Sequence, residues 1–589
     1  MFVIGALIFA ISTAGFFLFL HRRLAVPMEF VPAIFCVSCV CFLFFAGILN
    51  LLPEMTWCLA GAGVILFLRL WRGIGKLSKR SWIVLTCYAL ALVYGAYLLV
   101  KVPLSHYDDF SHWGLVIREM LKDDRFPNFS NTLIEFQAYP LGSALWVYYV
   151  CRLTGGGEGL FLLAQQILRV GFLLPVFAGI RKENRFLVIP ALGYVLFALI
   201  AGTGITNLLV DSLLPSAAVA LFAIFCCAQI DRKPAIALAA PMVFFLLQVK
   251  NSGIFFVLLF WVWAGVQIRK ASWPERKAFL LWDILFPCAG VMLWQKHVQM
   301  VFADGSTAKH AMTIANYQNT MLEKNAGDVL AILEGVVEKS FHIDNGSFWL
   351  LVVVTAALLL LFAVNIRVEQ KRTAVIMQLC INWGVYCLYM LGVWGMYIFS
   401  MPEAEAVTLA GFDRYSSTCG IFLYGVNALW LVRNVDSLLP RCRSLAVLAC
   451  AIAVVLPFWN ITANGVQSRY ACTSLLVRKH SGQEIRSRVE QSLDQYGWFW
   501  EDARCIVYQN EKDYGYLYYV LRYETGIADF TILEDLSAYD SLSQMANDAE
   551  YFLVWTPDVH SDQLLKESNC GDICGEQGAI VNLMSLQEN

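Results

Sequence analysis

Long apolar stretches separated by short polar turns make up the chain as far as residue 462. A helix that crosses a bilayer needs about 20 predominantly apolar residues, and roughly fourteen stretches of the chain meet or approach that length. We therefore expect spanning helices over these stretches: 2–20, 30–52, 57–70, 81–102, 160–180, 186–203, 212–229, 234–249, 253–268, 278–300, 347–366, 374–400, 416–432 and 444–462. The pattern predicts an all-α polytopic membrane protein.

The overall composition supports this interpretation. Apolar residues make up 59% of the chain, charged residues 15%, and the mean hydropathy is +0.60. These values exclude a soluble globular protein, and a net charge of −2 gives no reason to expect a nucleic-acid partner. We expect no cleavable signal peptide, because the first apolar stretch precedes its basic cluster, His21–Arg23.

Clusters of Lys and Arg fall at alternate turns, and such clusters mark the cytoplasmic side of a membrane protein. The clusters are His21–Arg23, Arg72–Arg80, Arg181–Lys182, Arg232–Lys233, Arg269–Lys270, Arg367–Arg372 and Arg433–Arg443. They are all cytoplasmic at once if both termini lie outside. The external loops are then 103–159, 204–211, 301–346 and 401–415. This topology predicts a multi-pass protein of the cytoplasmic (plasma) membrane.

The composition changes near residue 463, where the apolar stretches end. The tail, 463–589, contains two strand-like runs, Cys505–Tyr508 and Tyr551–Trp555, and helical patterns near 474–493 and 539–548. We expect a small extracytoplasmic α/β domain. It has neither a Gly-rich phosphate loop nor a nucleophile elbow, which favours a lid or docking domain over an independent enzyme.

The predicted domains are therefore the N-terminal spans 1–102, the first external loop 103–159, the membrane core 160–462 and the tail 463–589. Cys570 and Cys574 in the tail could form a disulfide or remain free.

The first external loop is patterned and is not a plain connector. Phe110, Trp113 and Ile117 recur at helical spacing, with Asp109 and His112 on a neighbouring face. This pattern predicts an amphipathic helix over 109–121 that lies on the bilayer and presents both polar residues above it. The simpler interpretation of Asp108 and Asp109 is a solvated helix start, since Asp is favoured at N-caps. Tyr139 to Gly142, followed by 143–152, predicts a second interfacial helix.

Other charged residues also lie at the predicted external ends of spans. Asp211 begins a long apolar span, and ionisable residues at membrane depth usually face a cavity or a partner. The positive and neighbouring residues are Lys250, Lys309, His310, Glu405, Arg414 and Tyr415. Lys and Arg at span ends can simply snorkel to water, but collected on one face they would form an anion site suited to phosphate.

These elements together resemble the GT-C fold glycosyltransferases, which include the protein O-mannosyltransferases and the aminoarabinose transferases. Residues 109–121 resemble the first-loop motif with its Asp, Tyr139–Leu141 resembles the Tyr-Pro element, and Asp211 resembles the second-loop Asp. Lys250–Gly253 resembles the Lys-x-x-Gly turn, and Arg414–Tyr415 a late Arg-Tyr. The resemblance covers roughly residues 81–430. The chain departs from the family pattern at Phe110, where the family has Glu, and in having three more spans before the motif loop than the single span of the family.

The resemblance implies transfer of a sugar, with inversion, from a polyprenyl-phosphate-linked donor to an extracytoplasmic glycan, lipid or protein. Asp109 would be the general base, with Asp108 beside it, and Asp211 would orient the acceptor or a divalent cation such as Mg²⁺ or Mn²⁺. The donor phosphate would be bound by cationic residues: Lys250, Lys309 and Arg414. Further candidates for the pocket are His112, Tyr139, His310, Glu405 and Tyr415.

Two alternatives remain open from the residues alone. A polysaccharide polymerase or ligase of another fold would also use external arginines, but would not need Asp109 ahead of an interfacial helix. A transporter or flippase for a lipid-linked glycan would need many spans and a basic cavity, and no repeat of two halves is visible.

Overall fold

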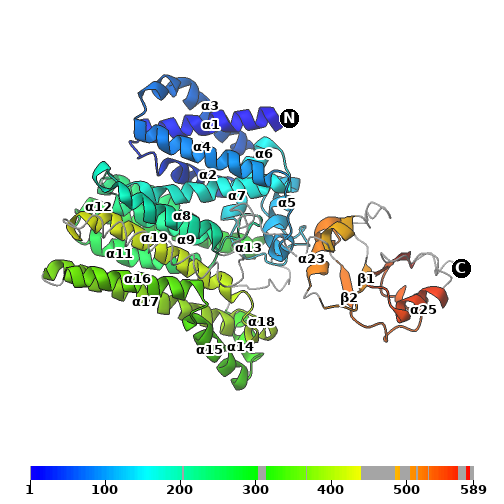
Figure 1. Cartoon of the computed structure of the whole chain (residues 1–589). Coiled ribbons are helices and arrows are strands. Elements are labelled where there is room, and N and C mark those ends of the chain that lie inside the picture. Colours follow the sequence, from blue (N-terminus) through cyan, green and yellow to red (C-terminus); the bar gives the residue numbers. More distant parts are fainter. Residues whose placement is uncertain are drawn as a thin grey trace. The chain divides into compact units, whose positions relative to one another are not determined.

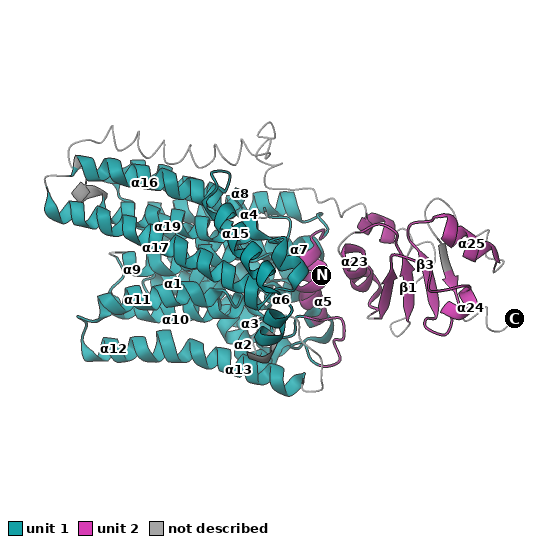
Figure 2. Cartoon of the chain, turned by 90° about the horizontal axis from the view of Figure 1, so that it is seen from below, with its two compact units in different colours: residues 1–103, 120–128, 136–478 teal, residues 104–119, 129–135, 479–589 magenta. Residues whose placement is uncertain are grey.

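The computed structural model describes the greater part of the chain. The described residues are 2–201, 204–227, 229–302, 314–365, 368–438, 485–490, 504–512, 515–527, 529–567 and 579–583. They are mostly helical, with a small sheet near the C-terminus (Figure 1). Their contacts divide the chain into two compact units, which Figure 2 shows in different colours. Unit 1 comprises Met1–Pro103, Met120–Asn128 and Phe136–Arg478, and unit 2 comprises Leu104–Glu119, Phe129–Glu135 and Lys479–Asn589.

Unit 1 is a bundle of helices. Its described helices are α1 (Phe2–Arg22), α2 (Val31–Ile48), α3 (Leu52–Leu70), η1 (Trp71–Lys76), α4 (Lys79–Leu99), α6 (Gly142–Thr154), α7 (Glu158–Leu173), η3 (Leu174–Phe177), η4 (Lys182–Leu187), α8 (Val188–Ile200), α9 (Leu213–Cys226), α10 (Arg232–Val249), α11 (Gly253–Ile268), α12 (Trp273–Phe279), η5 (Leu280–Leu285), α13 (Phe286–Val301), α14 (Ile314–Leu322), α15 (Ala326–Phe341), α16 (Gly346–Val364), α17 (Glu369–Phe399), α18 (Glu403–Val407) and α19 (Phe412–Leu438).

The helices confirm a polytopic, helical chain. In the described residues, ten helical segments are long and apolar enough to cross a membrane, and α9 and α11 are apolar but shorter. Each expected span up to 416–432 corresponds to a helix, whereas 444–462 lies outside the described residues. The expected number of about fourteen spans is therefore matched only in part.

Several helices begin where the local sequence offers a cap. The Ser78 side chain accepts from the backbone N–H of Ser81 at the start of α4. Asn325 caps α15 in a reciprocal capping box with Asp328, and Asn345 accepts from the N–H groups of the first turn of α16. Such caps satisfy backbone donors that have no partner inside the helix.

Helix α9 forms the centre of unit 1. Its residues from Leu213 to Ile224 are all buried, and α7, α10, α11 and α19 pack around it. A helix that is apolar on every side is stable only when it is surrounded. Its N-terminal end, which follows Asp211, is thereby held in the middle of the bundle.

The second predicted interfacial helix, 143–152, is present and is enclosed by other helices of unit 1. It is α6, and all its residues except Arg152 are buried, with α1, α2, α3, α7 and α10 packed around it. The Trp146 indole donates to the carbonyl of Ala164 at 2.7 Å. Five neighbouring helices thus cover a segment that is too short to span by itself, and its position at the membrane interface remains a prediction.

Unit 2 contains a four-stranded sheet with the order β2-β1-β3-β4. The strands are β1 (Cys505–Tyr508), β2 (Phe530–Leu533), β3 (Tyr551–Val554) and β4 (Ala579–Asn582), and the helices beside them are α23 (Tyr516–Thr525), α24 (Leu542–Met545) and α25 (Val559–Glu567). Strand β1 pairs in parallel with both β2 and β3, and β4 is antiparallel to β3. Every residue of β1 is buried, as expected of a central parallel strand.

The α/β character of the tail and its strands β1 and β3 confirm the prediction, whereas β2, β4 and α23 were not predicted. The expected helix near 539–548 is reduced to α24. Most of the expected helix at 474–493 lies outside the described residues, but 485–490 is helical.

The described contacts group part of the predicted first external loop with the tail. The π-helical segment η2 (Asp109–Trp113) and the start of α5 (Gly114–Asp123) belong to unit 2. The Phe110 ring packs edge-on against Tyr516 and Tyr523 of α23. This grouping differs from the predicted boundaries, which assigned the loop and the tail to separate domains.

Candidate functional site

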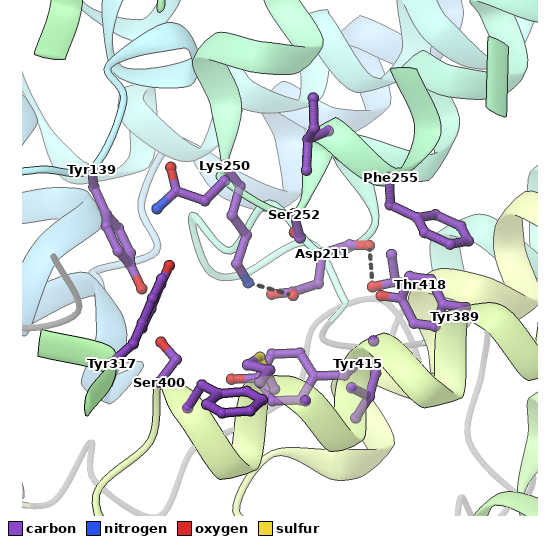
Figure 3. Close-up of a pocket in the computed structure, with 17 residues that line it drawn as sticks. Tyr139, Asp211, Lys250, Ser252, Phe255, Tyr317, Tyr389, Ser400, Tyr415 and Thr418 are labelled. Atoms are coloured by element: carbon purple, nitrogen blue, oxygen red, sulfur yellow. Dashed lines mark hydrogen bonds and ion pairs between the residues drawn. The ribbon is translucent and has the colours of Figure 1, made fainter. Parts of the chain in front are cut away.

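A cavity of about 450 Å³ lies within unit 1, where the ends of several helices meet (Figure 3). Its polar wall includes Tyr139, Asp211, Lys250, Asn251, Ser252, Tyr317, Ser400, Tyr415 and Thr418. These residues come from segments far apart in the sequence: the turn before α9, the turn between α10 and α11, the end of α17 and the first turns of α19. We call this cavity the Asp211 pocket.

Two cations converge on one buried carboxylate at this pocket. Lys250 Nζ lies 2.9 Å from Asp211 Oδ1, and Arg414 Nε lies 3.7 Å from Asp211 Oδ2. The Asp211 side chain is 4% exposed, against 17% for Lys250 and 21% for Arg414. Figure 3 shows the Lys250 side chain reaching down to the carboxylate. The cluster therefore carries one positive charge in excess, in surroundings that are largely removed from water.

The aromatic ring of Tyr415 holds both cations in place. Lys250 Nζ lies 5.2 Å from the ring centroid and Arg414 Cζ 5.1 Å from it. Arg414 Nη2 also donates to the Tyr415 hydroxyl at 3.0 Å. Cation–π attraction of this kind is worth about 0.5–2 kcal/mol, more where water is excluded. The ring thus keeps the two positive groups on one side of the pocket.

The backbone of Asp211 is fixed by α19. Thr418 Oγ1 donates to the Asp211 carbonyl at 2.9 Å, as the dashed line in Figure 3 marks. Thr418 is one helical turn beyond Arg414, so both side chains project from the same face of α19. One helix face therefore contacts the carboxylate and the backbone of Asp211 together.

Helix α7 supports the loop that leads to Asp211. Gln165 Nε2 donates to the Leu209 carbonyl at 3.1 Å, and Arg169 Nη1 donates to the Gly204 carbonyl at 2.8 Å. A second Arg169 nitrogen donates to the Ala198 carbonyl at the end of α8. A buried cation at a helix C-terminus is stabilised by the carbonyl dipoles there. Arg169 and Gln165 thus hold residues 204–209 at the base of the pocket.

The turn that presents Lys250 depends on a glycine. Lys250 is extended, with φ −159° and ψ 146°, and its carbonyl accepts from Gly253 N at 2.8 Å. A Cβ atom at position 253 would lie 2.1 Å from the Leu246 carbonyl oxygen. Only glycine allows this close return of the chain, which separates α10 from α11 and leaves Lys250 at the pocket.

The opposite wall of the pocket is apolar. It is formed by the start of α11 and the last turns of α17: Ile254, Phe255, Val393, Met396 and Phe399, with Gly392 and Gly395 between them. A Cβ atom at either glycine would meet nothing within 4 Å. The two glycines therefore leave open space along the wall, and the pocket joins a charged end to a hydrocarbon surface.

Two tyrosines and a short helix border the polar end. Tyr139 and Tyr317 lie beside each other on one side of the pocket in Figure 3, with their hydroxyl groups toward one another. Burial raises the pKa of the Tyr317 hydroxyl. Lys324, just after α14, donates to the carbonyls of Thr320 at 2.8 Å and Met401 at 2.6 Å. Burial lowers the pKa of Lys324. These bonds attach α14, which carries Tyr317, to the end of α17 beside Ser400.

The structure brings together most of the site residues predicted for this part of the chain. Tyr139, Asp211, Lys250 and Tyr415 line the pocket, and Arg414 contacts Asp211. Glu405 is exposed on α18 and does not line the pocket. Lys309 and His310 lie outside the described residues.

The three site candidates of the first loop, Asp108, Asp109 and His112, belong to unit 2. Asp109 is fully buried, His112 is 4% exposed, and Asp108 immediately precedes η2. The whole of η2 is buried in the described structure, so Asp109 and His112 are not the exposed face of an amphipathic helix there. Their position relative to a bilayer remains a prediction. The predicted helical conformation is confirmed, but its first turn is π-helical, a form often found at functional sites.

Asp109 has an ionisable neighbour in unit 2. Burial raises the pKa of the Tyr516 hydroxyl; Arg486 opposes that rise and the charge of Asp109 adds to it. Tyr516 donates to the Ser105 carbonyl at 2.9 Å, and the Arg486 guanidinium lies 5.3 Å from the centroid of Phe110. Helix α23 therefore packs against the segment that carries the predicted base.

Sequence reasoning missed several lining residues: Asn251, Ser252, Tyr317, Tyr389, Ser400 and Thr418. Thr418 could have been found from its position one turn after Arg414. Tyr389 lies inside an apolar span, where a tyrosine is ordinary, and nothing in its neighbourhood distinguishes it. Tyr317, which the structure places in α14, falls in the predicted external loop 301–346, where the sequence has no strong pattern.

Among the described residues, no group of three or more His, Cys, Asp or Glu is arranged to hold a metal ion. Asp211 already has Lys250 and Arg414 beside it, and their charges oppose the approach of a divalent cation. The predicted Mg²⁺ or Mn²⁺ remains a prediction.

Comparison of the chain with protein families, with characterised proteins and with solved structures finds no match. The argument for function therefore depends on the pocket and on the residues that form it.

Proposed function

We propose that the protein is a membrane glycosyltransferase that uses a lipid-phosphate-linked sugar as its donor, of the GT-C kind that its motifs resemble. The observation that carries the proposal is the convergence of Lys250 and Arg414 on Asp211 in a pocket with one apolar wall. We place this pocket on the extracytoplasmic side of the cytoplasmic membrane, in agreement with the distribution of Lys and Arg.

The charge of the cluster suits this donor. A polyprenyl phosphosugar is a phosphodiester with one negative charge, and the cluster has one positive charge in excess. Arg and Lys are the side chains that bind phosphate oxygens most strongly. The glycines and apolar side chains of α17 and α11 would accommodate the first part of the hydrocarbon chain.

The same charges would favour the reaction itself. When the acceptor oxygen attacks the anomeric carbon, the bond from that carbon to the phosphate oxygen breaks and its electron pair stays on the phosphate. The leaving lipid phosphate thereby gains a second negative charge, and cations placed where charge develops stabilise the transition state. We propose that Asp211 orients Lys250 and Arg414 for this role.

The proton of the acceptor hydroxyl needs a base, and Asp109 remains our prediction for it. One displacement at the anomeric carbon inverts its configuration. The acceptor would be a cell-surface glycan, a lipid or a protein.

The proposal is tested by transfer in vitro. The purified protein in nanodiscs should release free polyprenyl phosphate from a panel of radiolabelled polyprenyl phosphosugars when extracellular glycan or peptide acceptors are added. Asp109→Asn should abolish release while the protein still inserts and elutes as a single species.

Arg414→Ala should raise the donor concentration needed for half-maximal rate more than it raises the acceptor concentration needed for half-maximal rate. Full activity in Asp109→Asn would remove the base assignment, and the absence of transfer with every donor would contradict the proposed function.

A second candidate function, transport of a lipid-linked glycan, is favoured by one observation. Asp283 in η5 is fully buried in a helical segment long enough to span, and neither carboxylate oxygen has a hydrogen-bond partner among the described residues. Intramembrane acids of this kind occur in proton relays of transporters. Proteoliposomes that translocate a fluorescent lipid phosphosugar, and lose that activity in Asp283→Asn, would favour the transporter over the transferase.

A further inference from the structure

A second, shallow groove of about 560 Å³ runs along unit 1 between α11 and α12. It is lined by Trp261, Val262, Gly265, Val266, Ile268, Arg269, Arg276 and Phe279. The groove is separate from the Asp211 pocket and shares no lining residue with it. We call it the α11–α12 groove.

The middle of the groove is apolar and open. Ile268 and Phe279 are buried, whereas Val262 and Val266 are 71% and 64% exposed. A Cβ atom at Gly265 would meet nothing within 4 Å, so the absent side chain leaves space in the groove. Exposed valines on an apolar membrane helix, as we expect α11 to be, would contact the hydrocarbon of the bilayer. The groove therefore has the surface chemistry of a site for an acyl chain.

One end of the groove carries two arginines without carboxylate partners. Arg269 follows the last residue of α11, Arg276 lies in α12, and both are exposed. In the described part of the chain, no carboxylate lies within ion-pairing distance of either guanidinium. Arg276 Nε donates to the Ala271 carbonyl at 2.9 Å, which fixes the orientation of the guanidinium and leaves its terminal nitrogens available. Lys270 and Lys277 are exposed beside them and add further positive charge.

The neighbouring acid does not neutralise this end. Glu275 is engaged by the backbone N–H and hydroxyl of Ser272, and it lies 3.7 Å from Arg232. Its contacts thus face the helix start and α10. The groove end keeps an excess of positive charge at the level where α11 ends and α12 begins.

We infer that the α11–α12 groove binds an anionic phospholipid, with its phosphate on Arg269 and Arg276 and an acyl chain along Gly265. Each part of such a lipid has a complement in the groove: the two guanidinium groups for the headgroup phosphate, and the apolar surface between Trp261 and Phe279 for the chain. Basic pockets between spanning helices recognise anionic headgroups, most often on the cytoplasmic side. The turn between α11 and α12 carries the predicted cytoplasmic cluster Arg269–Lys270.

Native mass spectrometry of the purified full-length protein tests this inference. The wild-type protein should retain one phosphatidylglycerol more strongly than phosphatidylcholine of the same chain length. The double variant Arg269→Ala, Arg276→Ala should bind phosphatidylglycerol roughly tenfold or more weakly, because two charge-assisted contacts are lost. Replacement of both arginines by lysine should restore part of the affinity, since the charge returns without the bidentate geometry.

Two further variants separate the groove from general surface charge. Gly265→Leu should fill the groove and reduce retention with all charges intact, whereas Arg72→Ala with Lys76→Ala removes exposed cations of η1 that do not border the groove and should change nothing. Unchanged retention in the Arg269→Ala, Arg276→Ala variant would overturn the inference. Equal retention of phosphatidylcholine would also overturn it and indicate ordinary boundary lipid. Stronger retention of polyprenyl phosphate than of phosphatidylglycerol would instead identify the groove as a carrier-lipid site.

Discussion

At the scale of single residues, Asp211 and its two cations are the basis of our proposal for the donor. A buried carboxylate between two partly buried cations costs desolvation energy, and its attraction to them offsets that cost only when the geometry is good. The Lys250–Asp211 contact is short and the Arg414–Asp211 contact is longer. An anionic ligand can therefore replace part of the interaction between Asp211 and its cations. The excess positive charge is the property from which our proposal for the donor follows.

Asp211→Asn tests the role of the carboxylate. Without its charge the two cations repel each other, so we expect the free energy of unfolding to fall by about 1–3 kcal/mol. The same change should strengthen binding of a lipid phosphate, since the pocket then has two positive charges in excess. Thermal unfolding with and without polyprenyl phosphate measures both effects. Weaker stabilisation by the lipid in the variant than in the wild type would contradict this role.

Gly253→Ala tests the turn that presents Lys250. The new methyl group would lie 2.1 Å from the Leu246 carbonyl oxygen, so the turn must open and move Lys250 away from Asp211. We expect lower thermal stability and weaker donor binding. Gly384→Ala in α17 is the matched control, because a Cβ atom there meets nothing within 4 Å. Equal effects of the two substitutions would show that the close return at Gly253 is unimportant.

At the scale of elements, the residues of unit 2 that come from the first external loop are attached to α23 by charge and aromatic contacts. Arg522 pairs with Glu135, and the Tyr519 hydroxyl donates to the same carboxylate at 2.8 Å. Arg118 lies 4.2 Å from the ring centroid of Tyr523 and donates to its carbonyl. The tail domain thus supports the segment that carries Asp109.

Arg522→Ala should loosen this attachment, because it leaves the partly buried Glu135 with one partner fewer. Hydrogen exchange in 109–119 should become faster, and reversal of the pair in Arg522→Glu with Glu135→Arg should restore part of the protection. Lys512→Ala removes a cation that lies 3.8 Å from Glu534 and is 74% exposed, and it should have no effect. If exchange in 109–119 is the same in Arg522→Ala as in Lys512→Ala, the attachment does not depend on this ion pair.

Much of the helical fold could be predicted, since each span can be recognised from its length and apolar composition. The burial of α6 could not, because its thirteen residues carry no signal that distinguishes a surface helix from one enclosed by five neighbours. The pocket was predictable in its charged residues, which are rare in an apolar chain and share one side in the predicted topology. Its apolar wall was not, because Gly392 and Val393 look like any other residues of a spanning helix. The contact of α23 with the Asp109 segment joins residues about four hundred positions apart. A local sequence pattern cannot predict a contact between residues so far apart.

At the scale of the whole molecule, our account requires both termini to lie outside the membrane. Single cysteines introduced for Arg125 and Lys76 test this requirement with a reagent that does not cross membranes. We expect labelling from outside at 125 and not at 76, after correction for native cysteines such as Cys58 and Cys87, which are exposed in the structure. Labelling at 76 in intact cells would reverse the orientation and place the Asp211 pocket on the cytoplasmic side.

The central claim is that Lys250 and Arg414 bind the phosphate of a lipid-linked donor. Its most direct test is equilibrium binding of polyprenyl monophosphate to the purified protein in phosphatidylcholine nanodiscs. Lys250→Ala and Arg414→Ala should each weaken binding roughly ten- to a hundredfold, because each removes a charge-assisted contact from a site with little water. Lys101→Ala, which removes an exposed lysine outside the pocket, should leave binding unchanged. Equal affinity in all three variants would contradict the account.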